Sequence, residues 1–193
     1  MAKIIGISGI SGAGTTTITK ALGDALGVTT VFLDDFDDIS KSPSDYVEWF
    51  HESKDYADWH YPALEKVLAK LRAGHSLKHP VTKEDLLATP LIIFDGPLGR
   101  KHQATSRHVD FFIHIDTSMD VALARRLIRD YSVKMKSPCL EIIDELSWYL
   151  DIGRPLFDAS EIKASADFVT NGDVPVDEVL SSIMVELEKQ NLP

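Results

Sequence analysis

The residues best suited to chemistry are the glycines and threonines of residues 9–16, which read GISGAGTT. Their spacing is G-x-x-x-x-G-x-T, and they lie between an apolar run and an amphipathic run, which is the setting of a phosphate-binding loop. Glycine adopts backbone angles that other residues avoid, so the amides of residues 11–16 can point into one concavity at the start of a helix. The residues that we expect to contact the phosphates of a nucleotide are Gly9, Ser11, Gly12, Ala13, Gly14, Thr15, Thr16 and Thr17.

Two neighbouring threonines decide what this loop could do. Thr16 stands where the motif places a hydroxyl for Mg²⁺, whereas Thr15 occupies the place of the usual lysine. That lysine normally supports the β- and γ-phosphates. The loop therefore predicts either an enzyme in which another cation supplies the charge, or a nucleotide-binding protein without catalysis. A glycine-rich turn that binds no ligand is the third alternative.

Carboxylates follow two of the predicted strands. Asp34 and Asp35 come directly after residues 28–33, and Asp95 follows the apolar run 91–94. A carboxylate in such a place can accept a proton from a hydroxyl group or hold Mg²⁺. The alternative for each of them is an acidic residue in a solvated turn.

These side chains need a sheet to position them. Short apolar runs typical of buried strands alternate with stretches of helical periodicity. Strands that alternate with helices predict an α/β fold with a parallel sheet. Residues 34–61 show no clear period, so we expect a long loop or short helices there. The predicted strands are residues 3–8, 28–33, 91–94, 109–115 and 167–170.

Composition limits the partners of the protein. The chain has 193 residues, which suits one domain, and its formal net charge of -10 repels nucleic acids and anionic membranes. No window approaches the roughly 18 continuous apolar residues that a membrane span needs. Cys139 is the single cysteine, so no disulfide can form within the chain. We therefore expect a cytoplasmic protein that binds neither nucleic acid nor membrane.

Four segments together resemble the uridine kinase and phosphoribulokinase superfamily. They are the glycine-rich loop, FLDDFDD at residues 32–38, IFDGP at residues 93–97 and the long block at residues 110–130. The lysine-less G-A-G-T loop is similar to that of bacterial phosphoribulokinases. The resemblance implies a three-layer α/β P-loop kinase with a five-stranded parallel sheet, helices on both faces and strand order 2-3-1-4-5. It also implies one domain over residues 1–193, with a substrate-side insert at about 36–62 and a nucleoside-kinase-like lid at about 126–140.

The resemblance also implies roles for individual residues. Asp34 corresponds to the catalytic aspartate, and Arg126 and Arg129 correspond to lid arginines that clamp the transferring phosphoryl group. Lys134 and Lys136 fall where the family has further lid arginines. The alternative for these basic residues is a solvated helix face. The residues that the resemblance assigns to Mg²⁺ are Thr16, Asp34 and Asp95.

The acceptor site matches the family less well. The segment DWHYP at residues 58–62 has His60 where the family has an aspartate, although Asp58 lies close by. Residues 79–90 lack the tyrosine of the family's base-binding hairpin, so pyrimidine specificity does not transfer. A helix cap at Asp58 and core packing of the aromatic residues are the alternatives. The residues expected to bind the acceptor are Asp58, Trp59, Tyr61 and Arg100.

These observations predict phosphorylation, with ATP and Mg²⁺, of a hydroxyl group on a nucleoside or a similar small metabolite. Other acceptors remain open, among them a sugar phosphate and pantothenate-like or nicotinamide riboside-like compounds. A non-catalytic nucleotide-binding pseudokinase is the alternative from another class. The resemblance also implies a possible homodimer or homotetramer.

Overall fold

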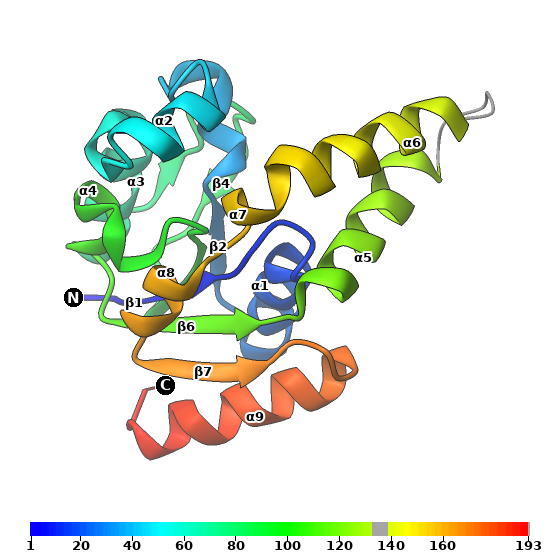
Figure 1. Ribbon diagram of the computed structural model, residues 1–193. Coiled ribbons are helices and arrows are strands. Elements are labelled where there is room, and N and C mark those ends of the chain that lie inside the picture. Colours follow the sequence, from blue (N-terminus) through cyan, green and yellow to red (C-terminus); the bar gives the residue numbers. More distant parts are fainter. Residues whose placement is uncertain (133–138, 193) are drawn as a thin grey trace.

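A parallel sheet of five strands forms the centre of the protein (Figure 1). The computed structural model describes residues 1–132 and 139–192. The strand order is β2-β5-β1-β6-β7, and every neighbouring pair is parallel. Counted along the chain, these five strands have the order 2-3-1-4-5, so the expected fold and strand order are confirmed. The strands are β1 (Lys3–Ser8), β2 (Thr29–Phe32), β5 (Leu91–Asp95), β6 (Phe111–Asp116) and β7 (Phe168–Asn171).

The sheet is covered by helices on both faces, which makes three layers. Along each central strand, neighbouring side chains enter opposite cores, because successive residues of a strand point to opposite faces. Ile4 of β1 packs with α3 (Pro62–Arg72), whereas Ile5 packs with α1 (Thr15–Leu26) and α9 (Val176–Lys189). Burial on both faces explains why β1 and β5 read as continuous apolar runs rather than alternating ones.

The segment expected to be a lid, at about 126–140, begins and ends within two helices that extend from one end of the sheet. They are α5 (Met119–Tyr131) and α6 (Cys139–Trp148), and Figure 1 shows them side by side, away from the body of the protein. The chain returns through η4 (Tyr149–Gly153), α7 (Arg154–Leu156) and α8 (Ser160–Ala164). Lys134 and Lys136 lie outside the described residues. Within the described ranges, no helix is long and apolar enough to cross a membrane.

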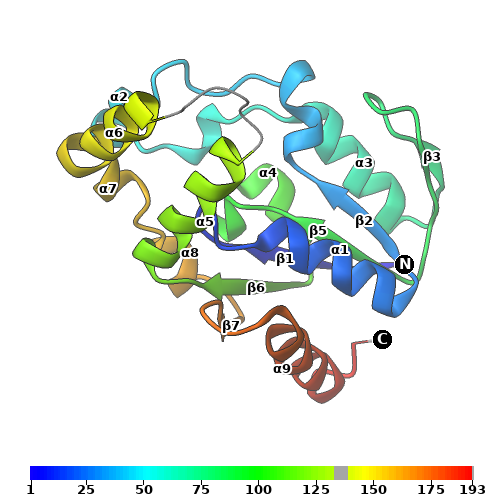
Figure 2. The ribbon, with the colours of Figure 1, turned by 90° about the vertical axis from the view of Figure 1, so that its right-hand side faces the viewer.

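The segment without a clear period folds into three short helices. These are η1 (Asp34–Ile39), α2 (Tyr46–Glu52) and η2 (Tyr56–Asp58), and they lie at the same end of the sheet as the phosphate loop (Figure 2). Asp45 and Asp55 begin α2 and η2 by accepting hydrogen bonds from backbone amides. The remaining elements are β3 (Leu77–Lys78), β4 (Asp85–Leu86), η3 (Gly99–Lys101) and α4 (Gln103–Ser106).

Candidate active site

The loop between β1 and α1 has the backbone of an anion-binding site. Gly12 and Gly14 adopt φ of +90° and +94°, in the left-handed region. A Cβ atom on Gly12 would lie 2.2 Å from the carbonyl oxygen of Ala122, so α5 passes too close for any side chain there. Gly14 begins α1 without a side-chain cap, so the first-turn amides of the helix keep their hydrogens for a ligand.

A cavity of about 600 Å³ lies over this loop. It gathers side chains from the ends of two strands and from the lid, far apart in the sequence. Asp34 comes from the end of β2, Asp95 from the end of β5, and Arg125 and Arg129 from α5. Two carboxylates and two guanidinium groups therefore surround the loop that is expected to hold phosphates.

Asp95 and Thr16 have the oxygen atoms that a divalent cation needs. The Thr16 hydroxyl donates to Oδ2 of Asp95 at 2.8 Å, and Asp95 is only 6% exposed. Its other oxygen, Oδ1, is buried and has no hydrogen-bond partner among the described residues. Burial raises the pKa of Asp95 to about 6, and hydrogen bonds from Thr16 and Thr15 oppose this shift. An orphaned carboxylate oxygen beside a hydroxyl fits Mg²⁺, which prefers oxygen ligands.

Asp34 lies at the first position of η1 and lines the same cavity, where it remains accessible to solvent. Burial raises its pKa, with the neighbouring charges of Asp37 and Asp35 adding to the effect, and the Arg129 guanidinium lowers it. A carboxylate whose pKa moves toward neutrality is a better proton acceptor from a hydroxyl group. Asp35 does not line this cavity, and its side chain is 42% exposed.

The structure places the lid arginines differently from one another. Arg129 lines the phosphate cavity and forms an ion pair with Asp130 at 2.7 Å. Arg126 does not line it; its guanidinium lies 2.9 Å from Oε1 of Glu145 and 4.5 Å from the ring centroid of Phe157. Glu145 belongs to α6, so the packing of the two helices holds the Arg126 guanidinium outside the phosphate cavity, in the wall of a small cavity that it shares with Ile10 and Ser11 of the loop.

Arg125 was missed by the sequence analysis, although it lies beside Arg126. It lines the phosphate cavity and donates to the carbonyl oxygen of Gly172 at 3.0 Å. Residues three and four apart share a helix face, so spacing alone pairs Arg129 with either neighbour. The deciding contact with Glu145 comes from a helix whose position the sequence does not show.

Arg125 also lines a second, smaller cavity on the other side of the loop. This cavity of about 220 Å³ meets the phosphate cavity at Gly14, Thr17 and Arg125. Its remaining walls are mainly apolar and come from α1 and from the segment that joins β7 to α9. It can take a flat ring attached to the phosphates, and we call it the base cavity.

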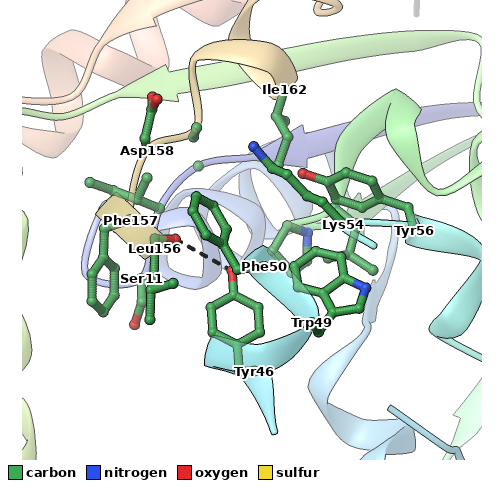
Figure 3. Close-up of a pocket in the computed structure, with 15 residues that line it drawn as sticks. Ser11, Tyr46, Trp49, Phe50, Lys54, Tyr56, Leu156, Phe157, Asp158 and Ile162 are labelled. Carbon is green, nitrogen blue, oxygen red and sulfur yellow. Dashed lines mark hydrogen bonds between the residues drawn. The ribbon is translucent and has the colours of Figure 1, made fainter. Parts of the chain in front are cut away.

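A third cavity, of about 230 Å³, lies between the loop and α2, and Figure 3 shows its aromatic walls. We call it the aromatic cavity. It shares the wall formed by Gly9, Ile10, Ser11 and Pro97 with the phosphate cavity. A molecule bound here would therefore lie next to the phosphates. Its aromatic residues are Tyr46, Trp49, Phe50, Tyr56 and Phe157.

The four residues expected to bind the acceptor do not line the aromatic cavity, although all of them are described. Asp58 is exposed and accepts a hydrogen bond from Ser53. The Trp59 ring packs edge-on against Trp49, and the buried Tyr61 donates to Asp37 at 2.7 Å. Arg100 forms an ion pair with Asp167 instead. Trp59 and Tyr61 line a separate cavity of about 460 Å³, which Asp58 and Arg100 do not line, so no cavity described here gathers all four side chains. Their part in binding the acceptor stays a prediction. The family's acceptor motif has diverged here, and these residues are engaged in packing and local hydrogen bonds.

Comparison with known proteins identifies the family of the chain. A sequence profile of the phosphoribulokinase / uridine kinase family matches residues 4–138. A uridine kinase of Borrelia duttonii (strain Ly) is 33% identical over 144 residues, covering 68% of this chain and 69% of that protein. A uridine kinase of Anoxybacillus flavithermus (strain DSM 21510 / WK1) is 24% identical and covers 98% of this chain and 97% of that protein.

Solved structures are similar in fold. A shikimate kinase from Bacteroides thetaiotaomicron has a TM-score of 0.54 at 16% identity, covering 96% of this chain and 98% of that one. A gluconokinase from Sinorhizobium meliloti 1021 has a TM-score of 0.53 at 16% identity, covering 98% and 93%. This likeness shows the fold of a P-loop kinase. The profile match over most of its length shows that the chain belongs to the phosphoribulokinase and uridine kinase family.

Proposed function

We propose that the protein transfers the γ-phosphoryl group of ATP to a hydroxyl group of a nucleoside or a similar small metabolite, with Mg²⁺ as cofactor. The observation that carries this proposal is the position of the base cavity and the aromatic cavity, which both adjoin the phosphate cavity. A nucleotide with its ring in the base cavity would place its phosphates over the loop. An acceptor in the aromatic cavity would reach the terminal phosphate across the shared wall.

Positioning and charge would carry most of the catalysis. The loop amides would hold the phosphate oxygens, and Arg125 and Arg129 would balance their charge. Asp34 would accept the proton of the acceptor hydroxyl, whose oxygen bonds to the γ-phosphorus while the bond from that phosphorus to the β-phosphate oxygen breaks and ADP leaves.

The metal would be held by the hydroxyl of Thr16 and the carboxylate of Asp95, with Asp34 as a further candidate ligand. When bound, Mg²⁺ would neutralise charge on the phosphate oxygens. The orphaned Oδ1 of Asp95 supports this assignment, because a buried carboxylate oxygen without a partner is costly unless a cation joins it.

The nature of the acceptor is supported by the names of relatives and by the walls of its cavity. Both relatives described above are uridine kinases. Aromatic side chains stack well on a flat ring, whereas a sugar phosphate would bring charged groups against apolar surfaces. A nucleoside therefore fits this cavity better than a sugar phosphate does.

The rival proposal is a protein that binds nucleotide without transferring phosphate. Thr15 in place of the usual lysine favours it, because the loop itself then lacks a cation. The positions of Arg125 and Arg129 oppose it, because two cations already line the phosphate cavity.

An acceptor panel distinguishes the two proposals. We expect ADP release from ATP and Mg²⁺ with at least one nucleoside, and ATP binding measurable by calorimetry. Asp34→Asn should lower kcat by at least about 10²-fold and leave the Kd for ATP within about twofold, as expected for a positioned base. Asp35→Asn is the matched control, because its side chain lies outside the cavity, and it should change kcat little.

ATP binding without turnover of any acceptor would favour the non-catalytic alternative. A large loss in Asp35→Asn with none in Asp34→Asn would show that the base has been assigned to the wrong residue.

A further inference from the structure

Lys54 is the unusual residue of the aromatic cavity, because its backbone is left-handed. Its φ is +43°, and its amide donates to the carbonyl oxygen of Trp49 at 2.7 Å, which ends α2. Helices usually place glycine at this position, since a Cβ atom disfavours the left-handed region. Among the described non-glycine residues, Lys83 and Asn191 share the feature. A strained residue in the wall of a ligand cavity suggests that its side chain has a function there.

The side chain of Lys54 forms part of the cavity wall (Figure 3). Its ammonium lies 4.7 Å from the ring centroid of Phe50 and 3.0 Å from Oε1 of Glu161. Lys101 lies 3.2 Å from the other carboxylate oxygen of Glu161, so two lysines share one carboxylate. Within the described part of the chain, Glu161 is the acceptor for the Lys54 ammonium. An ammonium has three hydrogens, so donor capacity remains for a ligand.

Lys54 is the basic residue among the described residues that line the cavity. The charged residues that line it, among those described, are Lys54 and Asp158. A carboxylate oxygen of Asp158 accepts a hydrogen bond from the backbone amide of Ser160 at 2.9 Å, near the start of α8. Aromatic rings form much of the remaining surface. The cavity therefore combines surfaces for a flat ring with the Lys54 ammonium, which donates hydrogen bonds and cannot accept them. The hydroxyls of Ser11 and Tyr56 and the carboxylate of Asp158 can accept.

We propose that Lys54 determines specificity by selecting acceptors whose flat ring carries a carbonyl oxygen over the same ring with an amino group in its place. This inference rests on the function proposed above. A carbonyl oxygen accepts a hydrogen bond from the ammonium, whereas an amino group presents hydrogens to a group that has no lone pair. The left-handed backbone places the side chain so that it enters the cavity from the end of α2.

Uridine and cytidine are the matched probes, because uridine carries a carbonyl oxygen at the edge of its ring where cytidine carries an amino group. We expect the wild-type protein to favour uridine over cytidine by about 10- to 100-fold in kcat/KM, the effect of a hydrogen bond to a charged group. Lys54→Met should reduce this ratio to near one through a higher KM for uridine, with the KM for ATP unchanged. Lys54→Arg, which keeps a donor, should retain most of the preference.

A stability measurement separates this role from a structural one. Lys54→Gly relieves the left-handed backbone, so its Tm should rise by about 2–4 °C or hold steady while the uridine preference is lost. Asn191→Gly is the matched control: it relieves the same kind of backbone outside the three cavities, so it should be as stable as or more stable than the wild type and keep the preference.

Each outcome decides the inference. A wild-type protein that turns over both nucleosides equally overturns it, as does Lys54→Met with an unchanged ratio. Quenching of tryptophan fluorescence by each nucleoside without ATP gives a readout that does not require turnover, because Trp49 lines the cavity. If neither nucleoside quenches or reacts, the inference fails. ADP release with another acceptor would then preserve the proposed kinase activity.

Discussion

On the phosphate side, a loop of backbone amides is joined by carboxylates from two strand ends. On the side where we propose that the acceptor binds, which we call the acceptor side, aromatic side chains come mainly from short helices. The phosphate side depends on positive-φ glycines at fixed spacing, which one short motif in the sequence records. The acceptor side depends on how α2 and η2 pack against α7 and α8, which no local pattern records. A family can therefore keep its phosphate chemistry while its acceptor site changes.

The largest loss in kcat is expected from the arginines on the phosphate side. Arg129→Ala should lower kcat by at least about 10³-fold, the scale of an arginine that stabilises a transferring phosphoryl group. The loss in kcat for Arg126→Ala should be at least about tenfold smaller than the loss for Arg129→Ala, because Glu145 and Phe157 hold the Arg126 guanidinium outside the phosphate cavity. Single-turnover rates with the best acceptor measure both. Equal losses would show that Arg126 leaves Glu145 during the reaction.

A second prediction uses the buried carboxylate of Asp95 and needs no acceptor. Burial raises its folded pKa from 3.8 to about 6, so the metal-free folded protein holds a proton that the unfolded chain releases between these values. Stability should therefore fall as the pH rises from about 4 to 6, by about 3 kcal/mol from this group. Asp95→Asn should be more stable than the wild type at pH 7.5 and should lose that advantage at pH 4.

The control for this prediction is Mg²⁺ itself. A cation that binds the folded protein stabilises it, so Mg²⁺ should raise the Tm of the wild type at pH 7.5 more than that of Asp95→Asn. Chemical denaturation at the two pH values gives the free energies of unfolding, and groups common to both proteins cancel in the difference. If Mg²⁺ raised the Tm of both proteins equally, Asp95 would not be a ligand of the metal.

The sequence predicted the sheet and the phosphate loop well, because both follow short-range rules. Strands expected at 3–8 and 167–170 are observed at Lys3–Ser8 and Phe168–Asn171. The β3–β4 hairpin was not predicted, since strands of two residues are too short to show a period. The strand order came from the resemblance to a family, because periodicity does not record which strands are neighbours.

The aromatic cavity could not be predicted from the sequence for a physical reason. Tyr46 donates to the carbonyl oxygen of Leu156, a contact between residues 110 apart in the chain. Short helices without a clear period give no signal of which face points inward, so Trp49 and Phe50 could not be assigned to a cavity. The resemblance of the DWHYP segment to the family's acceptor motif predicted Asp58 and its neighbours instead.

A third prediction compares the observed cavity with the site expected from the sequence. Phe50→Ala should raise the KM for the acceptor by about tenfold and leave the KM for ATP unchanged, because it removes a ring that would stack on the bound acceptor. Asp58→Asn should change neither KM by more than about twofold, since Asp58 is exposed and lies outside the cavity. Steady-state kinetics with each substrate varied in turn would separate the two sites. If Asp58→Asn raised the KM for the acceptor more than Phe50→Ala did, the acceptor would bind at residues 58–62, as the resemblance to the family implies.

The smallest expected effect concerns the missing lysine of the phosphate loop. Thr15→Lys should change kcat by less than about threefold if Arg125 and Arg129 already supply the charge, because a further cation then adds little to the stabilisation of the transferring group. Lys3 cannot substitute, since its ammonium pairs with Asp110 at 3.1 Å. Lys20, the next lysine along α1, lies 5.5 Å from the ring centroid of Phe32 and does not line the phosphate cavity.

The alternative for Thr15 gives the opposite pattern. If the chain binds nucleotide without catalysis, the wild type should show almost no turnover and Thr15→Lys should increase it. Arg125→Ala in the wild type and in Thr15→Lys completes the comparison. Where Arg125 supplies the charge, its loss should cost more in the wild type than in a loop that carries lysine, because the two cations then serve the same phosphate oxygens. Equal costs in the two backgrounds would show that Arg125 acts independently of position 15, which would leave Arg129 as the cation that replaces the lysine.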